Sequence, residues 1–435
     1  MGKDQRLAVE KQILKAEQLY KAKQFKKAGK TYHFAGNLLL KLNEYEKAKV
    51  CFINGAKIFM ELGRFDTSVE LFRQSGEACL RANNFIEANL IYKEALNLIP
   101  KLKSEGDRNS NHVIFSVLSY MCSYIKGTPN EGLEFLKRIS KKVDKEFFKE
   151  HQLIKLVSEI TLALRDNESK YVKKIKDNIG DYKLREAELK LLKYILLITH
   201  IKLRITTTFE LDKETYTTNE ILNLGLNFDT KSLVEIINDS FYQFELNQFN
   251  ITKFLINLSD NLTTNNKPIV PLSLDIGKEN HLQFKIKPHF QVDNSSIGPM
   301  VLTCELNNDL IFHYETQLII PTLVSPPATL TASIRNLRPP LIDKTFPLEI
   351  TIENQSQGEA LDLKLNIEFP EQLKIMRGTT NKQIYSLRSN EDIKWEINLK
   401  PLEAGDYVIK ILLKFVDPDQ NEIEEIKEFP ISIKL

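Results

Sequence analysis

The side chains that could carry chemistry are few in this chain of 435 residues, and they lie far apart. Metal binding and nucleophilic catalysis rely mainly on cysteine, histidine and carboxylate groups held close together. The cysteines occur singly, which excludes a Cys-x-x-Cys motif and a zinc knuckle. They are Cys51, Cys79, Cys122 and Cys304. We expect four small core residues in a reducing compartment, with no role as nucleophiles.

The seven histidines are also dispersed and form no metal-binding pattern. His281 and His289 could share one face of a strand, but Pro288 and the intervening lysines indicate a surface edge without acidic or thiolate companions. The chain has no His-Glu-x-x-His segment and no Gly-x-Ser-x-Gly elbow, and its glycines are too widely spaced for a phosphate-binding loop. The sequence therefore predicts no catalytic residue, no metal and no cofactor, and a protein that is not an enzyme.

One cluster of charge stands out near the N-terminus. It consists of Lys21, Lys23, Lys26, Lys27 and Lys30. Two interpretations stay open: an ordinary solvated rim, or a docking patch for an acidic protein or, peripherally, an anionic membrane. Nucleic-acid binding is disfavoured, because the interleaved aromatics Phe25 and Tyr32 belong to the core pattern described below and cannot stack on bases.

The composition is that of an ordinary globular chain, with 42% hydrophobic and 27% charged residues. This length suits about two to four domains. The net charge of +2 is unevenly placed, at about +12 over residues 1–200 and about −10 over residues 201–435. Two solvated surfaces of opposite sign are the simpler explanation of this asymmetry, and a basic half that meets an acidic partner or membrane surface is the alternative.

No targeting or membrane-spanning segment is expected. The N-terminus mixes charges of both signs and lacks an apolar leader. The longest apolar stretch, around residues 194–201, is far shorter than the roughly 20 residues that a spanning helix needs. We therefore expect a cytoplasmic protein.

An internal repeat organises the first hundred residues. Aromatic residues recur every 20 positions at Phe25, Tyr45, Phe65 and Phe85. A second aromatic series follows each of them, at Tyr32, Phe52, Phe72 and Tyr92. Small residues stand between and after them, including Ala28, Ala48, Ser68 and Ala88, and Gly36, Gly55 and Gly76. These offsets trace one stripe of a helix, so each unit is predicted to be one helix that must stack on its neighbours.

The repeat resembles the tetratricopeptide superfamily. Two units make a hairpin of 40 residues, which is similar to the soluble NSF attachment protein branch over about residues 5–100. The resemblance implies a curved solenoid whose surface grips a helical or coiled-coil partner. Recruitment of that family's disassembly ATPase is not implied, because its C-terminal leucine-bearing helix is replaced here by β-type sequence.

Helical patterns continue to residue 203 and then change to the alternation typical of strands. Further helices are predicted over residues 111–126, 130–142, 145–166 and 184–203. A first β-sandwich is predicted over residues 204–323, with residues 246–264 left open as an edge or a long loop. Residues 324–328, with two prolines, read as a stiff linker. A second, immunoglobulin-like sandwich is predicted over residues 329–435.

The second sandwich resembles modules of the CARDB and NEW3 kind. The likeness rests on the run from Ile350 to Gly378, which contains the Pro-Glu-x-Leu corner, and on the strand that begins at Gly405. Residues 214–220 of the first sandwich resemble arrestin-type sandwiches. Both likenesses imply a fold and say little about function.

The sequence thus predicts a multidomain α-then-β chain: a tetratricopeptide-like solenoid with a terminal helical bundle, followed by two tandem immunoglobulin-like sandwiches. The expected function is a non-enzymatic adaptor or scaffold that binds helical or acidic proteins, as in membrane-traffic assemblies. Two alternatives stay open. One is a regulatory or assembly subunit of an enzyme complex, and the other is a carbohydrate- or surface-binding module.

Overall fold

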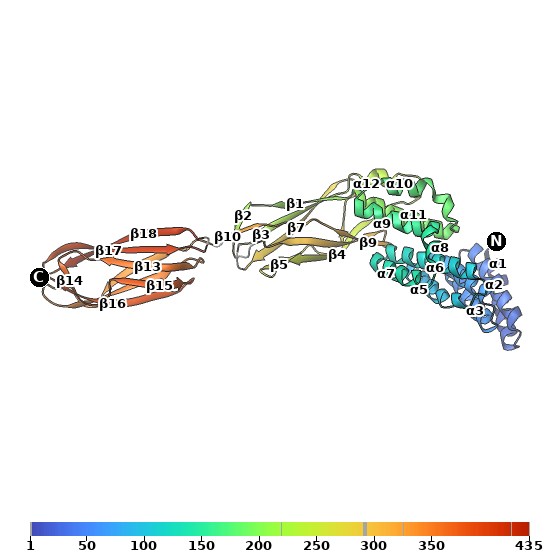
Figure 1. Cartoon of the computed structure of the whole chain (residues 1–435), viewed down its shortest axis with the longest axis horizontal. Coiled ribbons are helices and arrows are strands. Elements are labelled where there is room, and N and C mark those ends of the chain that lie inside the picture. Colours follow the sequence, from blue (N-terminus) through green and yellow to red (C-terminus); the bar gives the residue numbers. More distant parts are fainter. Residues whose placement is uncertain (1, 219, 290–293, 325, 419, 435) are drawn as a thin grey trace.

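The computed structural model describes residues 2–218, 220–289, 294–324, 326–418 and 420–434. Helices occupy the N-terminal part and antiparallel sheets the C-terminal part, as the sequence predicts. The molecule is elongated, with the helical region at one end and the two β-sandwiches following it in line (Figure 1). The N- and C-termini therefore lie far apart.

Five helices form the repeat. They are α1 (Gly2–Lys21), α2 (Phe25–Lys41), α3 (Tyr45–Glu61), α4 (Phe65–Arg81) and α5 (Phe85–Leu96). The corners between them share one backbone feature, a residue with positive φ placed two positions before the next helix. These residues are Lys23, Asn43, Gly63 and Asn83, with φ of 59°, 59°, 69° and 55°. A left-handed residue at this point stops one helix and turns the chain into the next.

Glycines let neighbouring helices of the repeat approach closely. Gly36 faces Phe52, and a Cβ added there would lie 2.6 Å from the ring. Gly76 faces Tyr92 in the same register, and an added Cβ would lie 2.3 Å from that ring. The rings of Phe52, Phe72 and Tyr92 are fully buried. The second aromatic series and the small residues of the repeat therefore form one interlocked core.

The later helices complete the helical region. They are η1 (Ile99–Lys101), α6 (Glu105–Ile125), α7 (Pro129–Ser140), α8 (Lys145–Glu150), α9 (Gln152–Asp166), α10 (Lys170–Asp177), η2 (Ile179–Tyr182) and α11 (Glu186–Arg204). The single helix expected over residues 145–166 is wrong, because His151 adopts an extended conformation (φ −67°, ψ 128°) and divides it. Its ring Nδ1 accepts a hydrogen bond from the amide of Leu153, which caps α9. Helix α10 escaped prediction because only Val172 and Ile175 are buried in it.

The first sandwich has two four-stranded sheets, in the orders β1-β3-β7-β5 and β6-β4-β8-β9, and a small parallel pair β10-β2. The strands are β1 (Thr206–Leu211), β2 (Thr215–Thr217), β3 (Leu222–Asp229), β4 (Phe249–Leu258), β5 (Leu262–Asn266), β6 (Leu272–Ser273), β7 (Glu279–Pro288), β8 (Ile297–Leu306), β9 (Leu310–Glu315) and β10 (Thr322–Val324). Helix α12 (Leu233–Ile237) lies in the connection between β3 and β4.

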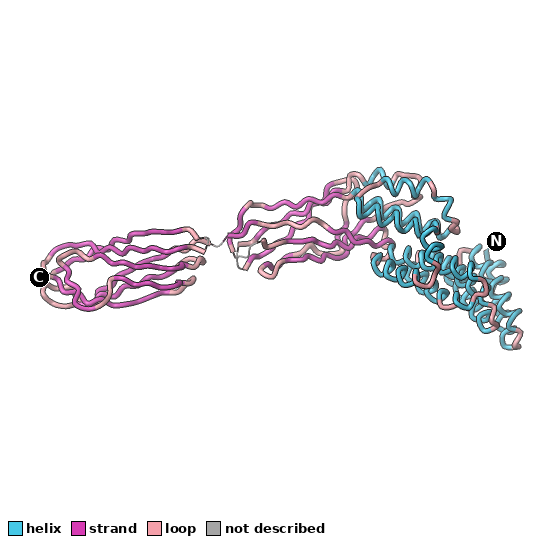
Figure 2. The backbone as a smooth tube through the Cα atoms, in the orientation of Figure 1, coloured by secondary structure: helices cyan, strands magenta, loops and turns pink. Residues whose placement is uncertain are grey.

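The second sandwich repeats this strand order. Its sheets are β11-β12-β16-β14 and β15-β13-β17-β18. The strands are β11 (Leu330–Asn336), β12 (Phe346–Asn354), β13 (Ala360–Glu368), β14 (Leu373–Arg377), β15 (Asn381–Leu387), β16 (Asp392–Pro401), β17 (Gly405–Val416) and β18 (Glu422–Ile433). In both sandwiches the strand after β4 or β13 crosses to the opposite sheet and the next strand returns, so the two share one topology. Figure 2 shows the two strand-rich bodies one after the other.

The open segment 246–264 is mostly an inner strand, and only its last residues belong to an edge strand. It contains β4, an inner strand that pairs with β6 and β8, and then the start of β5. Apolar residues stand at every second position over residues 270–276, but only Leu272–Ser273 form a strand there. Strands β14 and β15 were not expected from the sequence, because each has a single buried residue, Leu373 and Leu387, and neither shows a strong apolar alternation.

The hydrophobic core does not divide where the secondary structure changes. Buried residues from Val9 to Leu323 form one continuous cluster across the helices and the first sandwich. Residues Ala328 to Ile433 form a second, separate cluster. Of the expected linker 324–328, Ser325 lies outside the described residues. Pro326 and Pro327 pack on the second sandwich, where a Cβ added to Gly358 would lie 2.0 Å from the Pro326 carbonyl oxygen.

Replacement of Gly76 by alanine is expected to destabilise the repeat. The added methyl group must displace the buried Tyr92 ring, and such overpacking costs about 1–3 kcal/mol. Urea or thermal unfolding followed by circular dichroism measures the loss. Gly106→Ala is the matched control, because its Cβ would meet only the Ser104 hydroxyl at 3.8 Å. Equal unfolding midpoints for the two variants would contradict the ring-over-glycine packing.

The continuous core also predicts which fragments fold. Residues 326–435 are expected to unfold cooperatively alone, whereas residues 1–203 are expected to expose the apolar surface that the first sandwich covers. Binding of a hydrophobic dye and amide exchange would compare fragments 1–203 and 1–324. Cooperative unfolding of residues 1–203 without dye binding would show instead that the helical region is an independent unit.

Candidate functional site

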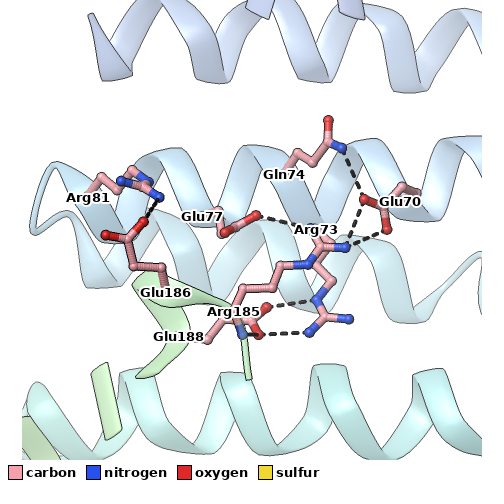
Figure 3. A network of polar contacts seen from close by, with 8 residues as sticks. All are labelled: Glu70, Arg73, Gln74, Glu77, Arg81, Arg185, Glu186 and Glu188. Carbon is pink, nitrogen blue, oxygen red and sulfur yellow. Dashed lines mark hydrogen bonds and ion pairs between the residues drawn. The ribbon is translucent and has the colours of Figure 1, made fainter. Parts of the chain in front are cut away.

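The first turn of α11 docks on α4, and this contact shows how the helical repeat holds a helix. Figure 3 shows the residues involved, which come from α4 and from the start of α11. They are Glu70, Arg73, Gln74, Glu77 and Arg81 on α4, and Arg185, Glu186 and Glu188 on the incoming segment. Charges of both signs stand on each side, so the two surfaces are complementary.

A buried ion pair forms the centre of this contact. The Arg73 guanidinium donates to both carboxylate oxygens of Glu188, each at 2.7 Å. The Glu188 side chain is fully buried, and that of Arg73 is 14% exposed. A bidentate Arg–carboxylate pair is among the strongest and most directional contacts in proteins. It therefore fixes both the position and the orientation of the α11 N-terminus.

Flanking contacts extend the network along α4. Arg185 donates to Glu70 at 2.8 Å and to Glu77 at 3.0 Å, and its backbone amide donates to Glu188 at 2.9 Å. Burial raises the pKa of the Glu77 carboxyl, although the Arg185 guanidinium opposes this shift. Arg81 and Glu186 form a further pair at 2.7 Å on the outer side. All four carboxylates have cationic partners, including Glu188 at the buried centre, where an unpaired charge would be costly.

The remainder of α11 is buried among α4, α6 and α9 and reaches β9. Its apolar residues are covered on all sides, as the sequence predicts for residues 191–201. The fully buried ones include Leu192, Ile195, Leu196, Leu197, Ile198 and Ile201. The protein thus covers part of one face of its repeat with one of its own helices.

The junction with the first sandwich rests on polar contacts at several points. The Tyr314 hydroxyl donates to the carbonyl of Ile205 at 3.2 Å, and Asn83 donates to Asp309 at 3.1 Å. Lys126 at the end of α6 forms a parallel bridge with Ile311 of β9. Lys176 pairs with Asp239 in the segment between β3 and β4. These contacts join the repeat, α6, α10 and the end of α11 to the first sandwich.

The five lysines come together at the corner between α1 and α2. Lys21 ends α1, Lys23 stands at the corner, and the other three lie in the first two turns of α2. All five are exposed, and among the described residues none of them forms an ion pair. The first turn of α2 also lacks an acidic residue, whereas those of α3, α4 and α5 each have one. We call these five residues the lysine corner.

The cysteines and histidines of the sequence analysis lie apart in the structure. All four cysteines are buried and unpaired, and burial raises the pKa of the Cys51 thiol to about 11. His289 Nε2 lies 2.8 Å from the Thr263 hydroxyl, and His281 contacts Asn227. Across the described residues, no three or more His, Cys, Asp or Glu side chains are grouped so as to hold a metal ion. Nor does any described helix have the length and apolarity needed to cross a membrane.

Sequence reasoning missed a cavity of about 710 Å³ between the helical bundle and β9. Tyr124, Lys202, Phe312 and His313 are among its lining residues. Burial lowers the pKa of both Lys202 and His313. Because these residues come from α6, α11 and β9, which are far apart in the sequence, no local motif could have revealed the cavity.

Removal of the buried arginine tests the docking of α11. Arg73→Ala leaves the Glu188 carboxylate buried without its main partner, and this is expected to cost about 3–5 kcal/mol. Arg81→Ala is the control, because Glu186 is 83% exposed and such pairs contribute less than about 1 kcal/mol. Arg73→Met combined with Glu188→Met should recover most of the loss in chemical unfolding. Equal effects of the two single variants would show that the pair is not desolvated.

No protein-family model and no curated protein matches this sequence. Among solved structures, the chain is similar to the adhesin InvE of Yersinia pseudotuberculosis, with 10% sequence identity and a TM-score of 0.20. The similarity covers 51% of this chain and 58% of the adhesin.

Proposed function

We propose that this protein is a scaffold whose helical repeat binds a protein partner and whose sandwiches place a second contact at a distance. The observation that carries this proposal is the docking of α11 on α4. One face of α4 holds a helix of the same chain through paired charges around a bidentate ion pair, and this supports the binding of a partner helix in a similar way. The elongated shape separates the lysine corner from the second sandwich by the length of the molecule (Figure 1).

The charge of the first hairpin supports an acidic partner. Residues 1–41 contain ten lysines and arginines and three aspartates and glutamates, whereas residues 42–100 contain seven and eight. The basic excess of the repeat therefore belongs to α1 and α2 alone. Such a concentration of charge speeds encounter with an acidic surface and selects against basic partners.

The 20-residue period and the glycine–ring packing support kinship with the tetratricopeptide superfamily and its attachment-protein branch. The strand alternation of the second sandwich similarly supports a module of the CARDB and NEW3 kind. We propose both as relationships of fold. A cytoplasmic adaptor in a membrane-traffic assembly is the cellular role that they favour.

Charge reversal at the lysine corner tests the proposal. The full-length chain with Lys21, Lys23, Lys26 and Lys27 changed to glutamate should lose partners that the native chain captures from an extract of its own cells. Mass spectrometry identifies the captured proteins, and capture by the native chain should weaken at about 0.5 M salt, because screening shortens the reach of exposed charges.

The control reverses four exposed lysines elsewhere in the helical region: Lys141, Lys142, Lys145 and Lys149. Equal capture by both variants and the native chain would contradict a role for the lysine corner. Flotation of the same proteins with phosphatidylserine vesicles separates a membrane surface from a protein partner. Binding to vesicles without capture of any protein would replace the scaffold proposal by a peripheral membrane role.

A further inference from the structure

Among the described helices, α2 packs closely on α1 and α3 alone, so its face that corresponds to the docking face of α4 holds no third helix in the way that α4 holds α11. Because the repeat has two units per hairpin, a position on α2 corresponds to the one 40 residues later on α4. The residues that bind the α11 N-terminus therefore have counterparts one hairpin away. Those counterparts are Lys30, His33, Phe34, Asn37 and Lys41, which we call the α2 face.

The structure also shows that α2 and α4 correspond position by position. Gly36 on α2 contacts Phe52 in the same way as Gly76 on α4 contacts Tyr92. Both helices are 17 residues long and both end in a left-handed corner, at Asn43 and Asn83. The α2 face and the docking face of α4 therefore point to the same side of the repeat.

The α2 face is more basic than the docking face of α4, because it has two lysines and no carboxylate. Glu70 and Arg81 of α4 correspond to Lys30 and Lys41 of α2, and both of these lysines are exposed. The acidic Glu77 corresponds to the neutral Asn37, and Arg73 to His33, whose ring lies 6.1 Å from that of Phe52. A copy of the α11 N-terminus would place the counterpart of Arg185 against Lys30 instead of Glu70, so a carboxylate fits this position better than an arginine.

An exposed aromatic ring stands in the middle of the α2 face. Phe34 corresponds to Gln74 of α4. Its side chain is 53% exposed, although α2 is otherwise well packed on its neighbours. Aromatic residues surrounded by polar groups are the usual anchors of protein interfaces. An apolar side chain of a bound helix would cover this ring, with carboxylates on either side to meet Lys30 and Lys41.

We propose that the α2 face is the docking surface for an acidic amphipathic helix of a partner protein, held one hairpin away from α11 and in the same manner. This inference rests on the proposed scaffold function and names the chemistry of its partner. The occupant carries a carboxylate opposite Lys30, an apolar residue against Phe34 and a carboxylate opposite Lys41. Anionic lipid offers charge without the apolar side chain at this spacing, which is why a helix fits better.

The probe is a pair of synthetic fluorescein-labelled helices of about four turns. One carries leucines flanked by glutamates on a single face, and its twin carries glutamine in place of each glutamate. We expect fluorescence anisotropy with the full-length chain to give at least about tenfold tighter binding for the acidic helix, the effect of roughly 1.4 kcal/mol. Equal affinity for the two helices would overturn the proposal.

Two variants locate the binding. Phe34→Gln with Lys41→Glu should weaken binding of the acidic helix by about tenfold or more. Lys11→Glu with Lys15→Glu removes more charge from exposed positions of α1 and should change binding by less than about twofold, because distant exposed charges are screened. An equal loss in both variants, or competition by phosphatidylserine vesicles that Phe34→Gln does not alter, would show attraction by charge alone and overturn the proposal. Unchanged thermal unfolding of the variants confirms that the fold is retained.

The same variants separate this inference from the scaffold proposal. If charge reversal at the lysine corner abolishes capture of native partners while Phe34→Gln with Lys41→Glu preserves it, the α2 face is not the docking surface and the scaffold proposal stands. If neither variant alters capture, both proposals fail.

Discussion

The buried pair between Arg73 and Glu188 fixes where the helical repeat meets the rest of the molecule. A carboxylate without solvent access is stable only when donors surround it, and Glu188 has the Arg73 guanidinium and the Arg185 amide. Helix α11 can therefore begin at one place on α4. From this point it runs through the bundle to β9, so the orientation of the first sandwich follows from the position of this pair.

Close packing within the repeat makes that anchor possible. Gly36 and Gly76 bring neighbouring helices into contact with buried rings, and cores packed in this way transmit displacements because they contain little free volume. The five helices of the repeat thus form a stiff surface. A stiff surface can hold a bidentate ion pair in register without the entropic cost of ordering flexible segments on binding.

The two sandwiches share a topology but differ in what they contact. The first merges with the helical core, through the segment between β3 and β4 and through β9, while the second has a core of its own. Only a short connection joins them, and its prolines pack against the second sandwich. This arrangement suits a molecule that extends a separate module away from a rigid base, which is the geometry expected of a scaffold.

The sequence by itself determined the α-then-β order, the 20-residue period and most helices and strands. These depend on local periodicity and on the choice of small or aromatic residues, which a single segment displays. It also indicated the lysine corner, because the five lysines are close in the chain. It did not indicate the break at His151, the weak strands β14 and β15, or the inner position of β4, since each depends on which neighbour covers the segment.

Tertiary structure alone decided which face of the repeat is occupied and which is free. Arg73 and Glu188 are 115 positions apart, and nothing in the sequence around either residue predicts their contact. The same holds for the single core that spans the helices and the first sandwich. The exposure of Phe34 points to a docking surface because α11 occupies the corresponding face of α4, and that contact belongs to the tertiary structure. Long-range contacts depend on the packing of the whole chain, so a local sequence pattern does not predict them.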